Sequence, residues 1–490
     1  MNSSFSLLDW SVFLGYFLLL ALSSYLLSRT KIASTREYFT ASNTLPTFAV
    51  ALSILATSQS AATFLGVPEF AYAHDFTFIG FYFSALLAVV FIARYFVPRF
   101  FALRSITVYE LIEKRYGMRA KKETALMFLV GRVMASGARL YIAALAISMI
   151  LFLDISFLHM LLSTLILVFA ALLYTYFGGV RSVVLSDVIQ LLTYVGAAFL
   201  VLFYLYGSLD GIDILTTLAS ENKLAFIETS LDGKFSLIGL LSGWLLLNIA
   251  AFGLDQDMTQ RVLSCHNKKE ASRALILSIL LSIPVVLLFL AIGALLFVHY
   301  QHTPVVQSFE GEKITIFMYY ILQEMPEGLR AFVTVGAIAA ALSSTNSVLG
   351  ALASVAIEDL YRPWKMQRAP HTQESHFLSA SKKAVLLFAL LLSLMAMLSY
   401  FWQRYAELSL IGFALGVMAF AYTGLLGLYF SAIFTSRGSA KLVPFALLGG
   451  FFTVLALQPY TFGIVLGFSW QIVIGTVVAF STMQLGGNRG

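Results

Sequence analysis

Residues 331–357 read AFVTVGAIAAALSSTNSVLGALASVAI, an apolar stretch that is long enough to cross a bilayer and holds a cluster of serines at its middle. Hydroxyl groups at bilayer depth need a partner, because lipid offers none. On a helix, residues four apart share a face, which pairs Ala340 with Ser344 and Ser343 with Ser347. Such a row of uncharged oxygens suits a partly dehydrated monovalent cation. Small residues at this spacing also let two helices pack closely, so this segment alone leaves both interpretations open.

The composition indicates a polytopic membrane protein. Of the 490 residues, 59% are hydrophobic and 11% are charged, and the mean hydropathy is +0.86, whereas soluble domains carry roughly 25% charged residues. A spanning helix needs about 20 apolar residues, and this criterion predicts about thirteen spans. Their approximate positions are 8–27, 46–70, 76–103, 122–152, 156–176, 182–207, 235–254, 272–298, 327–357, 380–402, 406–432, 440–457 and 461–484.

The loops between these spans predict the orientation. Lys and Arg concentrate in cytoplasmic loops, and an outer N-terminus puts all the basic loops on one side. These loops are 29–36, 104–122, the turn at Arg181, 261–273, 362–383 and 437–441. The two long loops on the other side, 208–234 and 299–326, are acidic. We therefore expect an outer N-terminus and a cytoplasmic C-terminus in the plasma or inner membrane. The net charge of +6 reflects this bias and predicts no nucleic-acid partner.

The predicted loops leave no room for a soluble domain. The longest are about 25–30 residues, too short for an independent core. The sequence has no Gly-rich phosphate loop followed by Lys and Ser/Thr. We expect a single transmembrane transporter domain over residues 1–490, not an enzyme, surrounded by the lipid bilayer and without an obligatory protein partner.

The span at 52–68 contains a polar interruption. Seven consecutive residues, ATSQSAA, carry four polar side chains, and Ala56 and Gln59 lie near one helical face. Gly66 and Pro68 weaken the helix further. An opened helix exposes carbonyl oxygens that can bind a cation, as in discontinuous transporter helices. The alternative is a Pro-kinked helix whose Ser and Thr side chains bond to their own backbone.

A second polar interruption lies at 244–261. Asn248 is the strongly polar residue within this span, where it either serves a site or makes an interhelical hydrogen bond. Asp255, Asp257 and Arg261 follow at the predicted cytoplasmic edge. We interpret these charged residues as a solvated or gate-region network.

Three further charges fall inside spans, where they suggest function. Arg132 and Arg139 are seven residues apart and share a helical face. Arg132 is near the cytoplasmic end and can extend its side chain to water. Arg139 is at mid-depth and needs an anion, either a protein carboxylate or that of a substrate. Asp187 either pairs with a cation or an arginine, or is a solvated acid near a helix N-terminus.

Three motifs together resemble the sodium/solute symporter family. GGVRSVVLSDVIQ (178–190) resembles its Gly-Gly…Thr-Asp…Gln signature, with Ser186 in place of Thr. DQDMTQRVLSCHNKKEA (255–271) resembles its cytoplasmic Gln-Arg…Lys-Glu-Ala stretch, and AAALSSTNS (339–347) resembles its Ala-x-x-Ser-Ser sodium motif. The family includes bacterial proline, galactose, pantothenate and sialic acid carriers and animal sodium/glucose carriers. The resemblance covers essentially the whole chain.

The resemblance implies an all-α membrane fold of the LeuT type, with two inverted five-helix repeats. The first repeat would occupy about 46–207 and the second about 235–432. The flanking helices would be those at about 8–27, 440–457 and 461–484. The first helix of each repeat would be broken, which agrees with the polar interruptions described above.

The resemblance also implies sodium sites. The main site would use carbonyl oxygens of the first broken helix, and a carbonyl and two hydroxyls of the serine cluster. Its residues would be Ala56, Gln59, Ala340, Ser343 and Ser344. Some family members resemble a two-sodium pattern, and the matching residues here would be Asp187, Ser344, Asn346 and Ser347. Asn346 stands where such members often have Ser.

The implied substrate cavity lies beside these sites. Its residues would be Ser58, Ser60, Thr63, Phe78, Tyr82, Arg139 and Asn248. The SxSxxTF run at 58–64 and the mid-depth Arg139 are most similar to the sialic acid carriers, whereas Tyr82 departs from their amide. The amide and acid side chains of the galactose-type pattern are absent.

These observations predict a secondary active symporter that imports a small organic solute, one bearing a carboxylate, together with Na⁺. Sialic acid-like compounds, amino acids and other organic acids fit this class. Proton coupling on the same fold, with Asp187 as the titrating group, and a neutral sugar carrier are the alternatives. A channel or a sensor is a more distant one.

Overall fold

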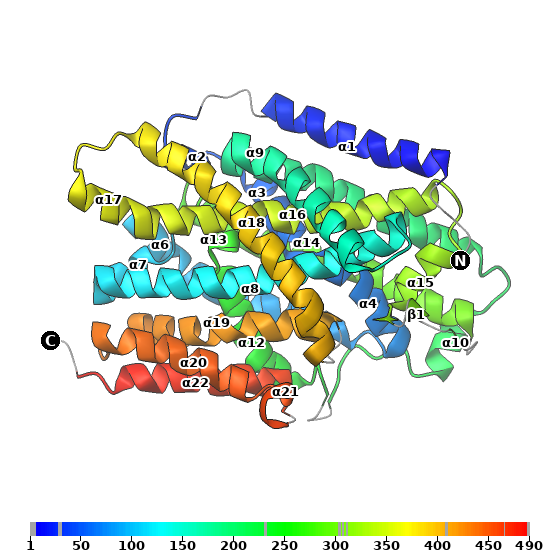
Figure 1. Cartoon of the computed structure of the whole chain (residues 1–490). Coiled ribbons are helices and arrows are strands. Elements are labelled where there is room, and N and C mark those ends of the chain that lie inside the picture. The colour runs from blue at the N-terminus through cyan, green and yellow to red at the C-terminus, as the bar shows by residue number, and fades with distance from the viewer. Residues whose placement is uncertain are drawn as a thin grey trace.

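The computed structural model describes residues 6–27, 32–229, 233–301, 305, 308–309, 312–406, 410–464 and 466–487. Parts of the predicted loops 29–36, 208–234 and 299–326, and of the predicted spans 406–432 and 461–484, lie outside these residues. Figure 1 shows long helices running side by side, with α1 along one edge and α20 and α22 along the opposite edge. The predicted all-α class is therefore correct.

The helices follow one another along the chain with short connections. The first half contains α1 (Leu7–Leu27), α2 (Thr35–Thr40), η1 (Ala41–Asn43), α3 (Thr47–Ser58), α4 (Ala61–Ala73), η2 (Thr77–Ile79), α5 (Gly80–Tyr95), α6 (Val97–Leu103), α7 (Glu110–Tyr116), α8 (Met118–Leu151) and α9 (Phe157–Gly207). The second half contains α10 (Ile214–Ser220), α11 (Leu237–Leu241), α12 (Gly243–Gly253), α13 (Gln256–Val262), α14 (Lys268–Tyr300), the strand pair β1 (Ser308–Phe309) and β2 (Glu312–Lys313), α15 (Ile316–Gln323), α16 (Leu329–Val355), η3 (Ala356–Tyr361), α17 (Arg362–Arg368), α18 (Glu374–Ala406), α19 (Leu410–Phe434), η4 (Ala440–Leu442), α20 (Val443–Ala456), α21 (Pro459–Phe462) and α22 (Phe468–Gln484).

The lengths of these helices suit a membrane. Within the described residues, seven helices are long and apolar enough to cross a bilayer, and the number rises to nine if each of two bent pairs is one span. Two shorter apolar helices cover Leu7–Ser23 and Ala440–Ala456. The 51 residues of α9 would extend well beyond a hydrocarbon core of about 30 Å.

A glycine divides α9. Gly179 has φ 57° and ψ −157°, a backbone conformation that is essentially restricted to glycine. A Cβ atom at this position would lie 2.4 Å from the carbonyl oxygen of Tyr38. The break predicted between the spans at 156–176 and 182–207 therefore exists, and the close approach of the α2 backbone explains why glycine is required there.

Both polar interruptions are bends. α3 and α4 meet at 66° across Gln59 and Ser60, and α11–α12 and α13 meet at 58°. The polar run ATSQSAA correctly predicted the position of the first bend, whereas Gly66 and Pro68, which were expected to weaken the helix further, lie inside α4. The helix instead opens at Ser60, whose extended backbone and side chain cap α4; its Oγ accepts from the amide of Thr63 at 3.4 Å.

The serine-rich α16 lies at the centre of the molecule. It packs along α9 and also contacts α8, α18 and α3, and most of its residues are buried. A Cβ atom on Gly336 would lie 2.6 Å from the Cβ of Ala197 in α9. The small residues of α16 therefore do allow close helix packing, as one of the two interpretations of the sequence proposed.

Candidate functional site

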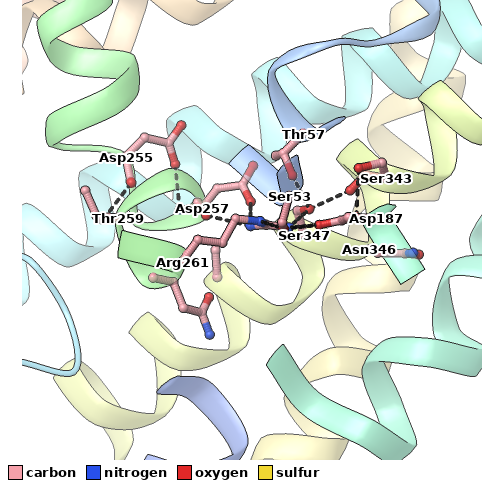
Figure 2. Close-up of polar contacts among 12 residues, drawn as sticks. Ser53, Thr57, Asp187, Asp255, Asp257, Thr259, Arg261, Ser343, Asn346 and Ser347 are labelled. Carbon is pink, nitrogen blue, oxygen red and sulfur yellow. Dashed lines mark hydrogen bonds and ion pairs between the residues drawn. The ribbon is translucent and has the colours of Figure 1, made fainter. Parts of the chain in front are cut away.

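A buried carboxylate joins three helices at the middle of the molecule. Asp187 of α9 is 0% exposed. It accepts a hydrogen bond from Ser343 of α16 at 2.8 Å and another from Ser53 of α3. Its counter-charge is Arg261 of α13, with Nη2 at 2.9 Å. Figure 2 shows these groups converging. The interpretation of Asp187 as a solvated acid is wrong, because the helices α3, α13 and α16 enclose it.

Arg261 uses its whole guanidinium group in this cluster. The Nε atom donates to Ser53 Oγ at 2.7 Å, and Nη1 donates to the carbonyl oxygen of Asp257 at 2.8 Å. Nη2 bridges Asp187 and Ser347. Ser347 Oγ in turn lies 3.1 Å from Thr57 Oγ1 of α3. Hydroxyl and carboxylate oxygens from α3, α9 and α16 thus surround one positive charge carried by α13 (Figure 2).

A second ion-pair cluster adjoins the first. Arg132 of α8 lies 2.9 Å from Asp255 and also pairs with Asp257, which itself lies 3.2 Å from Arg261. Tyr422 of α19 donates to Asp255. These charged side chains are at most 4% exposed. Arg132 therefore does not extend to water, and the acids at the end of α12 are not solvated, because α8, α13 and α19 close over them.

The residues expected at the main sodium site lie on α3 and α16. Ala56 and Ala340 are each 3% exposed, and Ala56 is in the last turn of α3, where carbonyl oxygens lack intrahelical amide partners. Ser343 turns to Asp187. Ser344 is half-buried and donates to the carbonyl oxygen of Ala341 in its own helix at 3.0 Å. Gln59 lies in the α3–α4 break.

The four residues expected at a second ion site do not all come together. Asp187 and Ser347 share Arg261. Ser344 instead lines a cavity on another face of α16. With its amide nitrogen as donor, Asn346 bonds to the carbonyl oxygens of Ala171 at 3.3 Å and Leu342 at 3.2 Å, and Figure 2 shows it pointing away from Asp187. The geometry thus brings Ser343, rather than Ser344 or Asn346, to the carboxylate.

The cavity beside α16 contains part of the expected substrate site. Its lining includes Ser60 and Ala61 at the α3–α4 break, Ser136 and Arg139 of α8, and Ser344. Arg139 is half-buried, and the sulfur atom of Met418 accepts a hydrogen bond from it. Among the described residues, Arg139 forms no ion pair with a carboxylate.

The other expected substrate residues lie around the break without lining this cavity. The Ser58 hydroxyl donates to the Leu55 carbonyl oxygen at 2.7 Å, and Thr63 Oγ1 is 3.4 Å from Ser60 Oγ. The amide of Gln59 donates to the hydroxyl of Tyr82 at 3.2 Å. Phe78 and Asn248 are the remaining two expected residues. The ring centroid of Phe78 lies 6.2 Å from that of Tyr82, and the amide of Asn248 donates to the carbonyl oxygen of Phe81 at 3.5 Å.

Residues 38–441 match the model of the sodium:solute symporter family. The chain belongs to this family. It is 29% identical to the sodium/sialic acid symporter SiaT of Proteus mirabilis, over 96% of this chain and 93% of that protein. It is 28% identical to the sodium/sialic acid symporter NanT of Aliivibrio fischeri, over 97% and 92% respectively.

Solved structures of transporters share the fold of this symporter. A substrate-bound, outward-open sodium-coupled sialic acid symporter matches it with a TM-score of 0.83, at 25% identity over 98% of this chain and 97% of the other. The nucleobase-cation symporter Mhp1 matches with a TM-score of 0.54 at 14% identity, over 91% and 93%, which indicates the fold alone. The protein is thus an integral membrane transporter, and sodium is its coupling ion. The family resemblance noted in the sequence is confirmed.

Several residues of this symporter's central cluster were not expected from the sequence. Ser53 and Thr57 both face the cluster from α3. They are four residues apart in an apolar helix, the same spacing that singled out the serines of α16. Arg261 was assigned to a cytoplasmic network, and its contact with Asp187 across 74 residues of chain has no counterpart in local sequence spacing.

Proposed function

We propose that this symporter imports a small organic carboxylate together with sodium. The observation that carries the proposal is the position of Arg139, which lines a cavity with Ser60, Ala61 and Ser344 and makes no ion pair within the described residues. A guanidinium group at membrane depth needs an anion, and a carboxylate matches its planar pair of donors.

The backbone at the cavity supports the same substrate class. Ala61 is the first residue of α4, and Ser60 is its N-cap. The N-terminus of a helix carries a partial positive charge and free amide groups, and in discontinuous transporter helices it faces anionic parts of substrates. The neighbouring Arg132 already pairs with Asp255 and Asp257, which leaves Arg139 as the cation available to a solute. The sialic acid symporters among its relatives make a sialic acid-like acid the first compound to test.

Sodium would link the two halves of the site. We assign the main ion to Ala56, Gln59, Ala340, Ser343 and Ser344, which are oxygen ligands of the type that hard cations prefer. An ion there ties α3 to α16, and Ser344 also lines the solute cavity. A second ion at Asp187, Ser343 and Ser347 is part of the proposal; Asn346 is not, because its amide bonds to α9.

We also propose the finer architecture. The chain forms one transmembrane domain with two inverted repeats, at about 46–207 and about 235–432, and about thirteen spans. The bends at α3–α4 and α12–α13 support this division, because each falls in the first helix of a repeat. The N-terminus is outside and the C-terminus cytoplasmic, in the cell's plasma or inner membrane, according to the distribution of Lys and Arg.

Uptake into proteoliposomes tests the function. An inward sodium gradient should drive accumulation of the solute, whereas a proton gradient without sodium should not. The solute is first identified by thermal-shift screening of carboxylates, amino acids and sugars, since ligand stabilisation follows RT ln(1 + [L]/Kd). The methyl ester of the bound acid should bind at least about tenfold more weakly, because it cannot pair with Arg139. Equal affinity for acid and ester would rule out carboxylate recognition.

A further inference from the structure

We propose that Arg261 is a tethered cation that takes the place of sodium at Asp187 when the ion has left, and that sodium and Arg261 occupy this carboxylate alternately. This inference rests on the proposed function and extends it to the return step of the transport cycle.

The two cations would use the same oxygens. Arg261 contacts Ser53 Oγ at 2.7 Å, Asp187 Oδ2 at 2.9 Å and Ser347 Oγ. Ser343 Oγ is 2.8 Å from the other carboxylate oxygen of Asp187. Hydroxyl and carboxylate oxygens are ligands of hard cations, so the guanidinium group lies where oxygens from three helices already converge (Figure 2). A sodium ion bound to the same oxygens requires that Arg261 moves away.

Without a cation beside it, Asp187 would be a buried and unpaired charge. Asp187 is 0% exposed, and Arg261 is its only ion-pair partner among the described residues. Removing one partner from a buried ion pair is strongly unfavourable. If sodium leaves Asp187 and nothing replaces it, the carboxylate remains buried without a counter-ion. The guanidinium group removes this penalty, and the empty carrier can reorient.

Arg261 lies on a different helix from Asp187 and its hydroxyl partners. It belongs to α13, the short segment beyond the 58° bend of the second broken helix, whereas Asp187 and the hydroxyls lie on α3, α9 and α16. A movement of α13 at the bend therefore carries Arg261 toward or away from Asp187 without displacing the other oxygens. Asp257, which holds Nη1 of Arg261 at 2.8 Å through its carbonyl oxygen, moves with it on the same helix.

The consequence is an expected separation of two transport modes. Exchange of labelled for unlabelled solute with sodium on both sides requires only the loaded carrier to reorient. Net uptake also requires the empty carrier to return. Loss of the Arg261 charge should therefore strengthen sodium binding and impair net uptake while sparing exchange.

The variant R261Q tests this directly. In solute-free protein, the sodium concentration for half-maximal thermal stabilisation should fall by roughly tenfold, and net uptake should fall several-fold more than exchange. R261K should retain more net uptake than R261Q, because it keeps the charge. R119Q serves as the matched control and should behave as wild type, since Arg119 is exposed and its one ion pair among the described residues is with Glu123 of its own helix.

The double variant R261Q/D187N keeps the test sharp if R261Q folds poorly. Without the carboxylate, Arg261 has no charge to neutralise after sodium leaves, so loss of Arg261 should have no further effect. R261Q/D187N should therefore match D187N in its ratio of net uptake to exchange. A ratio for the double variant far below that of D187N would overturn the proposal. It would also be overturned if R261Q had wild-type sodium affinity, or if R261Q reduced net uptake and exchange equally. Absence of sodium-dependent stabilisation and uptake in the wild type would instead refute the proposed function itself.

Discussion

At the residue scale, the site is a set of buried oxygens and guanidinium groups whose charges compensate each other. Asp187 pairs with Arg261, and Asp255 and Asp257 pair with Arg132. Arg139 is the guanidinium group that faces a cavity and has no carboxylate partner in the described chain. Buried charges in a membrane are costly unless they are paired. Under the proposed function, Arg139 is therefore the arginine that, among the described residues of this cavity, remains available for the carboxylate of the solute.

The first prediction concerns Ser343, the hydroxyl of α16 that donates to Asp187 at 2.8 Å. S343A should raise the sodium concentration for half-maximal uptake by about tenfold, equivalent to ~1.4 kcal/mol, because it removes an ion ligand. S344A should act in the same direction. S354A is the control, since the Ser354 hydroxyl donates to the carbonyl oxygen of Ala351 in its own helix at 2.8 Å. Sodium titration of solute uptake measures all three variants. Wild-type sodium dependence in S343A and S344A would show that the main site is wrongly assigned.

The second prediction concerns Arg139. R139K should weaken solute binding by about tenfold or more, because an ammonium group cannot reproduce the planar pair of donors. R139A should abolish binding, yet it should still be inserted and fold, since no described carboxylate depends on Arg139. Isothermal titration with the identified acid and size-exclusion profiles of the purified variants provide the measurement. Loss of folding in both variants would show that Arg139 is structural.

At the element scale, breaks in helices create the site. The α3–α4 bend opens the backbone at Gln59 and Ser60, and the α12–α13 bend presents α13 to the central carboxylate. A helix end exposes carbonyl oxygens on one side and amide groups on the other. Under the proposed function, one bend would thus offer oxygens to a cation and a positive helix terminus to an anion, so that ion and solute would bind side by side.

The third prediction concerns the break in α9. G179A should lower the apparent melting temperature markedly, because its φ of 57° is strained by about 1–3 kcal/mol for other residues and its Cβ would lie 2.4 Å from a backbone oxygen of Tyr38. G196A in the same helix is the matched control, since a Cβ there meets no atom within 4 Å. It should be neutral or slightly stabilising. Equal melting temperatures for the two variants would contradict the proposed backbone requirement.

At the scale of the whole molecule, the site links helices that are distant in sequence. Asp187 in α9 connects to α3, α13 and α16, and Ser344 of α16 lines the cavity that contains Arg139 of α8. Ligands that bind to this shared set of helices affect each other's affinity. Thermodynamic linkage requires the two effects to be equal.

The fourth prediction is this reciprocity. Saturating sodium should raise the affinity for the solute by the same factor by which saturating solute raises the affinity for sodium, on the order of 5–150-fold. Thermal-shift titrations in both directions measure the two factors.

In D187N the Hill slope of sodium activation should fall toward one, because the second ion loses its carboxylate. An unchanged slope above one in D187N would remove Asp187 from the ion sites.

The sequence alone determined the class of protein, the approximate positions of the helices and a set of candidate site residues. The length of an apolar stretch predicts a membrane span. Polar residues inside a span are easy to identify, because burying them in lipid is costly and they therefore suggest a function. The serine cluster of α16, Asp187 and the two arginines of α8 were all visible in this way. Helix breaks were also predicted at the two polar interruptions, and both bends lie there, although Gly66 and Pro68 remain inside α4.

Only the tertiary structure decided which of these residues meet. Sequence spacing relates residues along one helix, whereas the partner of Asp187 is Arg261, 74 residues away, on a helix that a bend redirects into the core. The same packing pairs Arg132 with Asp255 and leaves Arg139 to the cavity, although both arginines share a helical face in the sequence. Ion pairs across helices depend on how the helices are arranged in three dimensions, and no local pattern in the chain encodes that arrangement.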